Sequence, residues 1–202
     1  MVMTFPNQLT LLRMGIVPIF IIALIYGNTG LALLVFLLAG VTDGLDGLLA
    51  RRLNQKTALG AFLDPMADKL LITSAFVLLS MPGINPANTI PMWLTILVIS
   101  RDVIIVLAAL IIHMAYGRRT FNPSIFGKVA TSVQVSVVFL VLLLNWLSLQ
   151  PQAIRYAFDA VLAITLLSGF HYLATLPRLA SSDNNTTSAS AGNQRQAKDV
   201  QD

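Results

Sequence analysis

The chain lacks cysteine altogether, all of its nine acidic residues are aspartate, and few residues are charged. Without cysteine, disulfides, thiolate metal sites and cysteine nucleophiles are excluded, although the cellular compartment is left open. Charged residues make up 11% of the 202 residues, whereas soluble domains carry roughly 25%. Hydrophobic residues make up 56%, and the mean hydropathy is +0.77. This composition predicts an integral membrane protein.

Long apolar segments follow one another along the chain, each close to the roughly 20 residues that a membrane-spanning helix needs. Six segments qualify: 9–27, 31–52, 58–81, 90–115, 125–148 and 153–176. We therefore predict an all-α membrane protein with six transmembrane helices. The first eight residues are expected to form an interfacial entry, and the N-terminal stretch to stay in the mature protein, because it lacks the marks of a signal peptide.

The end of the chain differs in composition from the rest. Residues 178–202 are rich in Ser, Asn, Thr and Gln and have no apolar periodicity. Such a segment cannot bury a core, so we expect a disordered polar tail. Residues 1–177 are expected to form a single membrane domain.

Basic residues divide the connections between the apolar segments into two classes. The turns 28–30 and 82–89 contain no Lys or Arg, whereas the connections 51–57 and 116–128 are basic. By the positive-inside rule, both termini and the two basic connections are predicted to be cytoplasmic, and Arg155 runs against this pattern. The net charge of +4 is therefore interpreted as topology signals and contacts for anionic lipid, not as nucleic-acid binding.

Four aspartates lie inside the second and third apolar segments: Asp43, Asp46, Asp64 and Asp68. An ionised carboxylate in a spanning helix costs about 3 kcal/mol on insertion scales. The spacings i, i+3 and i, i+4 place each pair on one helix face. In an antiparallel hairpin, Asp43 and Asp64 lie at equal depth, roughly 12 Å from the basic turn. The four carboxylates can then converge on two divalent cations, and oxygen-only ligands favour Mg²⁺ or Mn²⁺ over zinc.

Each of these features also has a purely structural interpretation. The acids could pair with cations, but the basic groups of the turn 51–57 are expected to reach toward water, and Lys69 can satisfy one acid at most. Gly47 and Gly60 either permit close helix contact or leave room for a nucleotide. Arg51, one helical turn beyond Gly47, is either a topology charge or a ligand for a pyrophosphate.

The acids and their neighbours form the pattern Asp43-x2-Asp46-Gly47-x2-Ala50-Arg51-x8-Gly60-x3-Asp64-x3-Asp68. This pattern resembles, position for position, the signature of the CDP-alcohol phosphatidyltransferase family, and the resemblance extends over about residues 5–176. It implies a homodimer of six-helix subunits, with a polar cavity for two metals and a nucleotide near the cytoplasmic face. By the same resemblance, the first three aspartates would be metal ligands, and Asp68 would be both a ligand and the general base.

The resemblance also implies a reaction. Gly47, Arg51 and Gly60 would lie around the CDP moiety of CDP-diacylglycerol. The phosphatidyl group would pass to the hydroxyl of an acceptor alcohol, Asp68 would take the proton, and CMP would leave. Family members that resemble this chain use glycerol 3-phosphate or phosphatidylglycerol as the acceptor, and both stay open here. Inositol phosphate, serine and choline are ranked behind them.

Arg101 and Lys128 are the candidate acceptor-binding residues. Arg101 lies beside Asp102 well inside the fourth apolar segment, and Lys128 begins the fifth. Both approach the same half of the membrane, where they could receive the acceptor's phosphate. Alternatively, the Arg101–Asp102 pair anchors helices. The enzymes that use glycerol 3-phosphate usually continue this pair with a Leu-Arg-Glu cluster. This chain is apolar there, a departure that favours phosphatidylglycerol.

Two other classes of protein also place acids in apolar helices. Transporters bind ions in this way, but they commonly show repeated halves, and this chain has no internal repeat and gathers its acids toward one face. A catalytically idle scaffold would not be expected to keep all four aspartates. A site that faces the cytoplasm favours the bacterial inner membrane, with an organelle membrane as the alternative.

Overall fold

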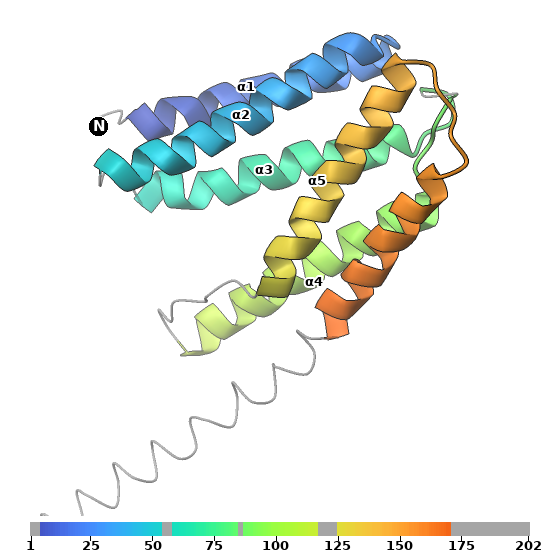
Figure 1. Cartoon of the computed structure of the whole chain (residues 1–202). Helices are drawn as coiled ribbons and strands as arrows, with labels where there is room; N and C mark the ends of the chain where they lie inside the picture. The colour runs from blue at the N-terminus through green and yellow to red at the C-terminus, as the bar shows by residue number, and fades with distance from the viewer. Residues whose placement is uncertain (1–4, 54–57, 85–86, 117–124, 171–202) are drawn as a thin grey trace, which may run out of the picture.

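The structure is a computed structural model that describes residues 5–53, 58–84, 87–116 and 125–170, with side chains in the ranges 15–42, 69–84, 87–107 and 127–170. Within these ranges the chain is all-helical and has no strand (Figure 1). The labelled helices are α1 (Phe5–Ile25), α2 (Thr29–Leu53), α3 (Ala58–Leu79), α4 (Met92–Tyr116) and α5 (Ile125–Trp146). A sixth helical stretch covers residues 154–170. The prediction of six helical segments is confirmed over the described part of the chain.

Helix α1 departs from its predicted bounds at its start. It begins at Phe5, so residues 5–8, which were expected to form an interfacial entry, belong to the helix. Pro6 is compatible with this position, because the first N–H groups of a helix have no intrahelical partner and the ring presets φ. The predicted tail, residues 178–202, lies outside the described residues.

The residues Gly27 and Asn28 end α1 and start α2. Gly27 has a positive φ of 71°, which glycine adopts without steric strain. Its N–H donates to the carbonyl of Leu24 at 2.9 Å, and the N–H of Asn28 donates to the carbonyl of Ala23 at 2.9 Å, the two bonds of a Schellman motif. The side-chain Oδ1 of Asn28 then accepts from the N–H of Leu31 at 3.1 Å, which is an N-cap.

The connection between α3 and α4 is fixed to the end of α5 by two asparagines. The Oδ1 of Asn145 accepts from both the backbone N–H and the Nδ2 of Asn88, each at 2.9 Å. The Nδ2 of Asn145 donates to the carbonyl of Asn88 at 3.1 Å, and the Nδ2 of Asn88 donates to the carbonyl of Leu149 at 2.7 Å. Both asparagines are buried. The pair therefore closes the end of the bundle opposite the basic connections.

The same end is packed closely through a glycine. A Cβ added to Gly30, in the first turn of α2, would lie 2.9 Å from both Cδ1 and Nε1 of Trp146. Real Cβ atoms essentially never come so close, so a side chain at position 30 would displace the indole. Small residues at helix contacts allow this close approach. The start of α2 and the end of α5 are thus held together.

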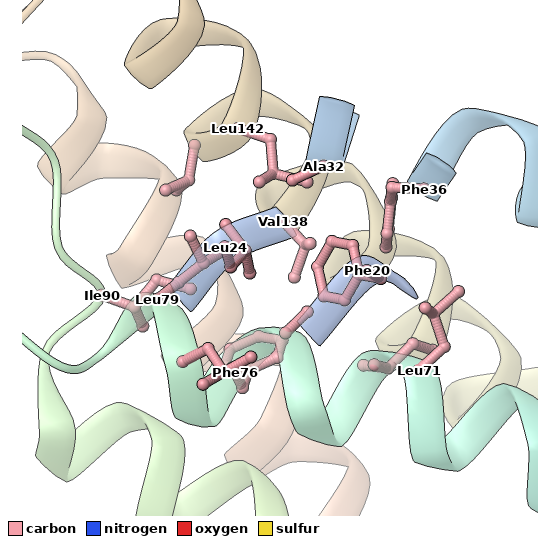
Figure 2. Close-up of a cluster of buried hydrophobic side chains, with 14 of the residues drawn as sticks. Phe20, Leu24, Ala32, Phe36, Leu71, Phe76, Leu79, Ile90, Val138 and Leu142 are labelled. Carbon is pink, nitrogen blue, oxygen red and sulfur yellow. The ribbon is translucent and has the colours of Figure 1, made fainter. Parts of the chain in front are cut away.

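The core includes buried side chains from all five labelled helices and from the 154–170 helix. Helix α1 packs on α2 and α3, and α5 packs on the same two helices, while α4 packs on α3. Figure 2 shows the side chains that fill this space, and the fully buried ones include Phe20, Leu24, Phe76, Leu79 and Leu142. The rings of Phe20 and Phe36 lie with centroids 6.0 Å apart, at 42° to each other. These contacts stabilise the arrangement of α2 and α3, the helices that bear the four aspartates.

The outward faces of the helices are apolar as well. Large hydrophobic side chains are exposed along several helices, among them Ile19, Ile22, Leu34, Leu38, Val103, Ile104, Leu107 and Leu167. In the side-chain ranges that the structure describes, one helical stretch, Gly127–Trp146, is long and apolar enough to cross a membrane. The apolar stretches Gly15–Ile25, Thr29–Thr42 and Lys69–Leu79 are shorter within those ranges. Crossing by all six helices, with both termini in the cytoplasm, stays a prediction.

Candidate active site

The four aspartates lie on two continuous helices. Asp43 and Asp46 fall within α2, and Asp64 and Asp68 within α3, where the backbone is helical at each position. An uninterrupted helix places residues three or four apart on one face, so each pair shares a face. Their side chains lie outside the described ranges.

The two helices have a common framework. Both α2 and α3 pack on α1 and on α5, and Figure 1 shows them running in opposite directions. Gly47 lies on α2 and Gly60 on α3, four residues before Arg51 and four residues after Lys56. In an antiparallel pair the two glycines thus lie at equal depth. The side chain of Arg51 and the whole of Lys56 lie outside the described ranges.

Arg101, the first of the candidate acceptor residues, is part of a buried polar cluster. Its Nη1 donates to Oδ1 of Asp102 at 2.7 Å, and its Nη2 donates to Oγ of Ser168 at 2.5 Å. The other carboxylate oxygen of Asp102, Oδ2, accepts from Nζ of Lys69. Arg101 is 8% exposed, and Ser168 is fully buried. We call these four residues the polar junction; it joins α3, α4 and the helix at residues 154–170.

Within the described side-chain ranges, four buried polar atoms have no hydrogen-bond partner. They are Nε of Arg101, Oγ1 of Thr165, and both side-chain polar atoms of Gln134. Thr165 precedes Ser168 by three residues and therefore lies on the same helix face. Buried polar groups in native proteins are generally hydrogen-bonded. Each of these groups is therefore a candidate for binding a polar ligand or a water.

Lys128, the second candidate, has a different setting. It lies in the first turn of α5 and is exposed. No hydrogen bond or ion pair joins it to another side chain of the described ranges. The sequence analysis assigned Arg101 and Lys128 to the same phosphate. Among the side chains that the structure describes, polar contacts are found for Arg101 and not for Lys128.

Comparison with known proteins gives the family. The family model for CDP-alcohol phosphatidyltransferase matches residues 3–170. The chain belongs to this family. It is a phosphatidyltransferase of phospholipid biosynthesis, and the family is membrane-associated.

Curated relatives of this phosphatidyltransferase have two kinds of name. A probable phosphatidylglycerophosphate synthase of Mycobacterium tuberculosis is 38% identical over 83% of this chain and 79% of its own length. A CMP-forming cardiolipin synthase of Streptomyces coelicolor is 35% identical over 90% of this chain and 86% of its own. The CDP-diacylglycerol–glycerol-3-phosphate 3-phosphatidyltransferase of Escherichia coli is 37% identical over 84% of this chain and 92% of its own.

Reasoning from the sequence missed part of the polar junction of this phosphatidyltransferase. Lys69 was considered as a partner for the aspartates of the pattern, whereas the structure pairs it with Asp102 on another helix. Ser168 and Thr165 were not singled out. The sequence feature that could have identified them is a pair of hydroxyl residues, three positions apart, in the otherwise apolar stretch 160–170. Gln134 was also not singled out, although it is almost wholly buried and has no hydrogen-bond partner among the described residues.

Proposed function

We propose that this phosphatidyltransferase moves the phosphatidyl group of CDP-diacylglycerol to the hydroxyl of a glycerol-type acceptor and releases CMP. The acceptor is glycerol 3-phosphate or phosphatidylglycerol. The observation that carries the proposal is the eight-position aspartate pattern on α2 and α3 of a chain of this family. The names of the relatives support both acceptors, because they include phosphatidylglycerophosphate synthases and cardiolipin synthases.

Four carboxylates would hold two divalent cations: Asp43, Asp46, Asp64 and Asp68. The donor set fits such ions, because carboxylate oxygens are the ligands that Mg²⁺ and Mn²⁺ prefer. Its placement fits as well, since each pair shares a face of a continuous helix. When bound, the cations would polarise the pyrophosphate and offset the charge that builds on the leaving CMP.

The side chains around the aspartates would perform the remaining steps. Asp68 would accept the proton of the acceptor hydroxyl. The acceptor oxygen would form a bond to the phosphorus that bears diacylglycerol, and the bond from that phosphorus to the oxygen of CMP would break. Gly47 and Gly60 would leave space for the nucleotide, and the planar fork of Arg51 suits its pyrophosphate. Because a carboxylate is a weak base, most of the acceleration would come from positioning.

Arg101 would bind the phosphate of the acceptor. Its guanidinium is buried, and its Nε–H has no partner among the residues that the structure describes. Two cations, Lys69 and Arg101, share the single carboxylate of Asp102, so these three groups leave one positive charge for an anion. Lys128, exposed at the start of α5, would meet the same phosphate from the cytoplasmic side.

The setting proposed for this reaction is a membrane. The five labelled helices have 21 to 25 residues, or about 31–38 Å, close to the ~30 Å of a hydrocarbon core. Six spanning helices with both termini in the cytoplasm would form one domain over residues 1–177, with 178–202 as a polar tail. We further propose that the protein is a homodimer in the bacterial inner membrane. Its active site would face the cytoplasm.

A CMP-release assay tests this function. The purified chain in lipid is given CDP-diacylglycerol, Mg²⁺ or Mn²⁺, and one acceptor at a time: glycerol 3-phosphate, phosphatidylglycerol, inositol phosphate or serine. Release with one of the first two and not with the others is the expected result. Arg101→Ala should mainly raise the KM of that acceptor. Absence of CMP with every acceptor would contradict the proposal.

A further inference from the structure

The carboxylate of Asp102 bridges two cations from different helices. Its Oδ1 accepts from Arg101 on α4, and its Oδ2 accepts from Lys69 on α3. The side chain of Asp102 is 11% exposed and that of Arg101 8%, whereas that of Lys69 is 37% exposed. The buried part of this arrangement is therefore the Asp102–Arg101 pair, and Lys69 joins it from a wetter position.

We propose that Asp102 is a positioning residue for the acceptor. By holding Arg101 and Lys69 at once, it fixes the guanidinium that receives the acceptor's phosphate and ties it to α3. Lys69 directly follows Asp68 in α3, so the tie sets the distance between the acceptor phosphate and the general base. This role rests on the proposed function above, and it assigns no contact with substrate to Asp102 itself.

The bonds of the guanidinium support this role. One terminal nitrogen of Arg101 is held by Asp102 and the other by Ser168, which lies on a third helix. With both ends of the planar fork fixed, the group cannot turn, and Nε is its one nitrogen without a hydrogen-bond partner among the described residues. The hydroxyl of Thr165, one turn from Ser168, is also buried and unpartnered. Among the described residues, Nε of Arg101 and this hydroxyl are the unpartnered polar atoms on α4 and the 154–170 helix, and we assign them to an oxygen of the acceptor.

A purely structural ion pair would have a different geometry. Neighbouring residues on a helix do not face each other, so the Arg101–Asp102 bond requires the guanidinium to fold back toward its own helix. The direct link between helices is the pair of Asp102 with Lys69, and the bond between Asp102 and its neighbour Arg101 adds no further link. Apolar residues of similar volume would also stabilise a buried contact as well as, or better than, a buried ion pair. The geometry is instead that of a cation held in one orientation.

Asp102→Asn tests this proposal, because the amide keeps the shape but cannot bridge two cations. The full chain in lipid is assayed for CMP release with whichever acceptor the wild type uses, and CDP binding in the presence of Mn²⁺ is measured by calorimetry. We expect the acceptor KM to rise about tenfold or more, while the KM for CDP-diacylglycerol and the affinity for CDP stay within about twofold of the wild type. Asp102→Glu, which keeps the charge, should recover part of the acceptor KM.

Two further variants provide a control and a second test of how Arg101 is held. Asp159→Asn removes an exposed aspartate of the 154–170 helix and should leave every constant unchanged. Ser168→Ala keeps all charges and removes one bond to Arg101; we expect the acceptor KM to rise about threefold, and this variant decides the matter if Asp102→Asn fails to fold.

Two results would overturn the role of Asp102. One is an unchanged acceptor KM in Asp102→Asn, or in Ser168→Ala if the first variant does not fold. The other is a loss of CDP affinity by the same factor as the acceptor KM, which would assign Asp102 to the general fold. A wild type that releases no CMP would instead contradict the proposed function, so the two failures are distinguishable.

Discussion

Arg101 illustrates, at the scale of one residue, how apolar helices hold a charge. Its side chain is 8% exposed and is bonded to Asp102 and Ser168. Breaking a buried pair by removing one partner typically costs about 3–5 kcal/mol, because the other charge is left buried and unpaired. Ionisable groups at such depth in membrane proteins are generally functional. The junction therefore favours a binding role for Arg101 over an anchoring role.

At the same scale, a single carboxylate of the aspartate pattern should decide turnover. We expect Asp64→Asn to lower kcat for CMP release by at least about a hundredfold, because losing even an outer-shell partner of a metal ligand costs 10–100-fold. Binding of Mn²⁺, followed by electron paramagnetic resonance, should weaken in parallel. Asp159→Asn, at an exposed position, is the matched control. Normal turnover in Asp64→Asn would contradict the metal-ligand assignment.

At the scale of elements, two helix ends use the same backbone device with different residues. Both α1 and α5 end in a left-handed residue, Gly27 with φ 71° and Ser148 with φ 54°. After Ser148, the N–H of Leu149 donates to the carbonyl of Leu144 at 2.9 Å, as in a Schellman motif. Glycine is suited to this conformation, whereas serine is strained in it by about 1–2 kcal/mol.

This difference predicts opposite effects of two substitutions. Ser148→Gly should raise the free energy of unfolding by about 0.5–1 kcal/mol, because the relieved strain exceeds the extra freedom of the unfolded chain. Gly27→Ala should lower it by about 1–2 kcal/mol; an added Cβ there meets nothing within 4 Å, so the loss comes from the backbone alone. Thermal unfolding in detergent measures both, and shifts of the same sign would contradict the strain argument.

The asparagine clasp between Asn88 and Asn145 is a second stabilising feature at this scale. Asn145→Ala leaves the N–H of Asn88 without its acceptor, and an unsatisfied buried donor costs about 1–3 kcal/mol. We expect the unfolding temperature to fall by about 5 °C while the acceptor KM is unchanged, since the clasp lies at the end of the bundle away from the aspartates. Gln150→Ala, at an exposed position of the same end, should change neither. A raised KM in Asn145→Ala would link that end to the site.

The helices were predictable because each signal is local. The break at Gly27-Asn28 follows from residues that end and start helices, and the aspartate pairs share faces through their spacing alone. The contacts between helices were not predictable in this way. Asn88 and Asn145 lie 57 positions apart, and Arg101 and Ser168 lie 67 apart, and nothing in either residue's neighbourhood identifies its partner. The junction around Arg101 therefore required the packing of three helices to be known.

The whole molecule has two unlike ends and an apolar outer surface. One end contains the clasp, Gly30 packed on Trp146, and connections without basic residues; Arg155 lies in the first turn of the 154–170 helix at this end. At the other end lie the end of α2 and the start of α3, the helices that bear the aspartate pattern. Between the ends, the outward faces of several helices are apolar. This polarity fits a protein that spans a bilayer with its chemistry on one side.

The absence of cysteine makes the proposed topology directly testable, because an introduced cysteine is the sole thiol of the chain. Gln152→Cys lies in the exposed connection before the 154–170 helix, on the side predicted to face out, and Ser188→Cys lies in the tail predicted to be cytoplasmic. In intact bacterial cells, we expect an impermeant maleimide to label Gln152→Cys, and to label Ser188→Cys only after permeabilisation. Equal labelling of both variants in detergent is the control. Labelling of Ser188→Cys in intact cells would place the C-terminus outside and would contradict an active site that faces the cytoplasm, because the tail and the basic connections share one side by the positive-inside rule.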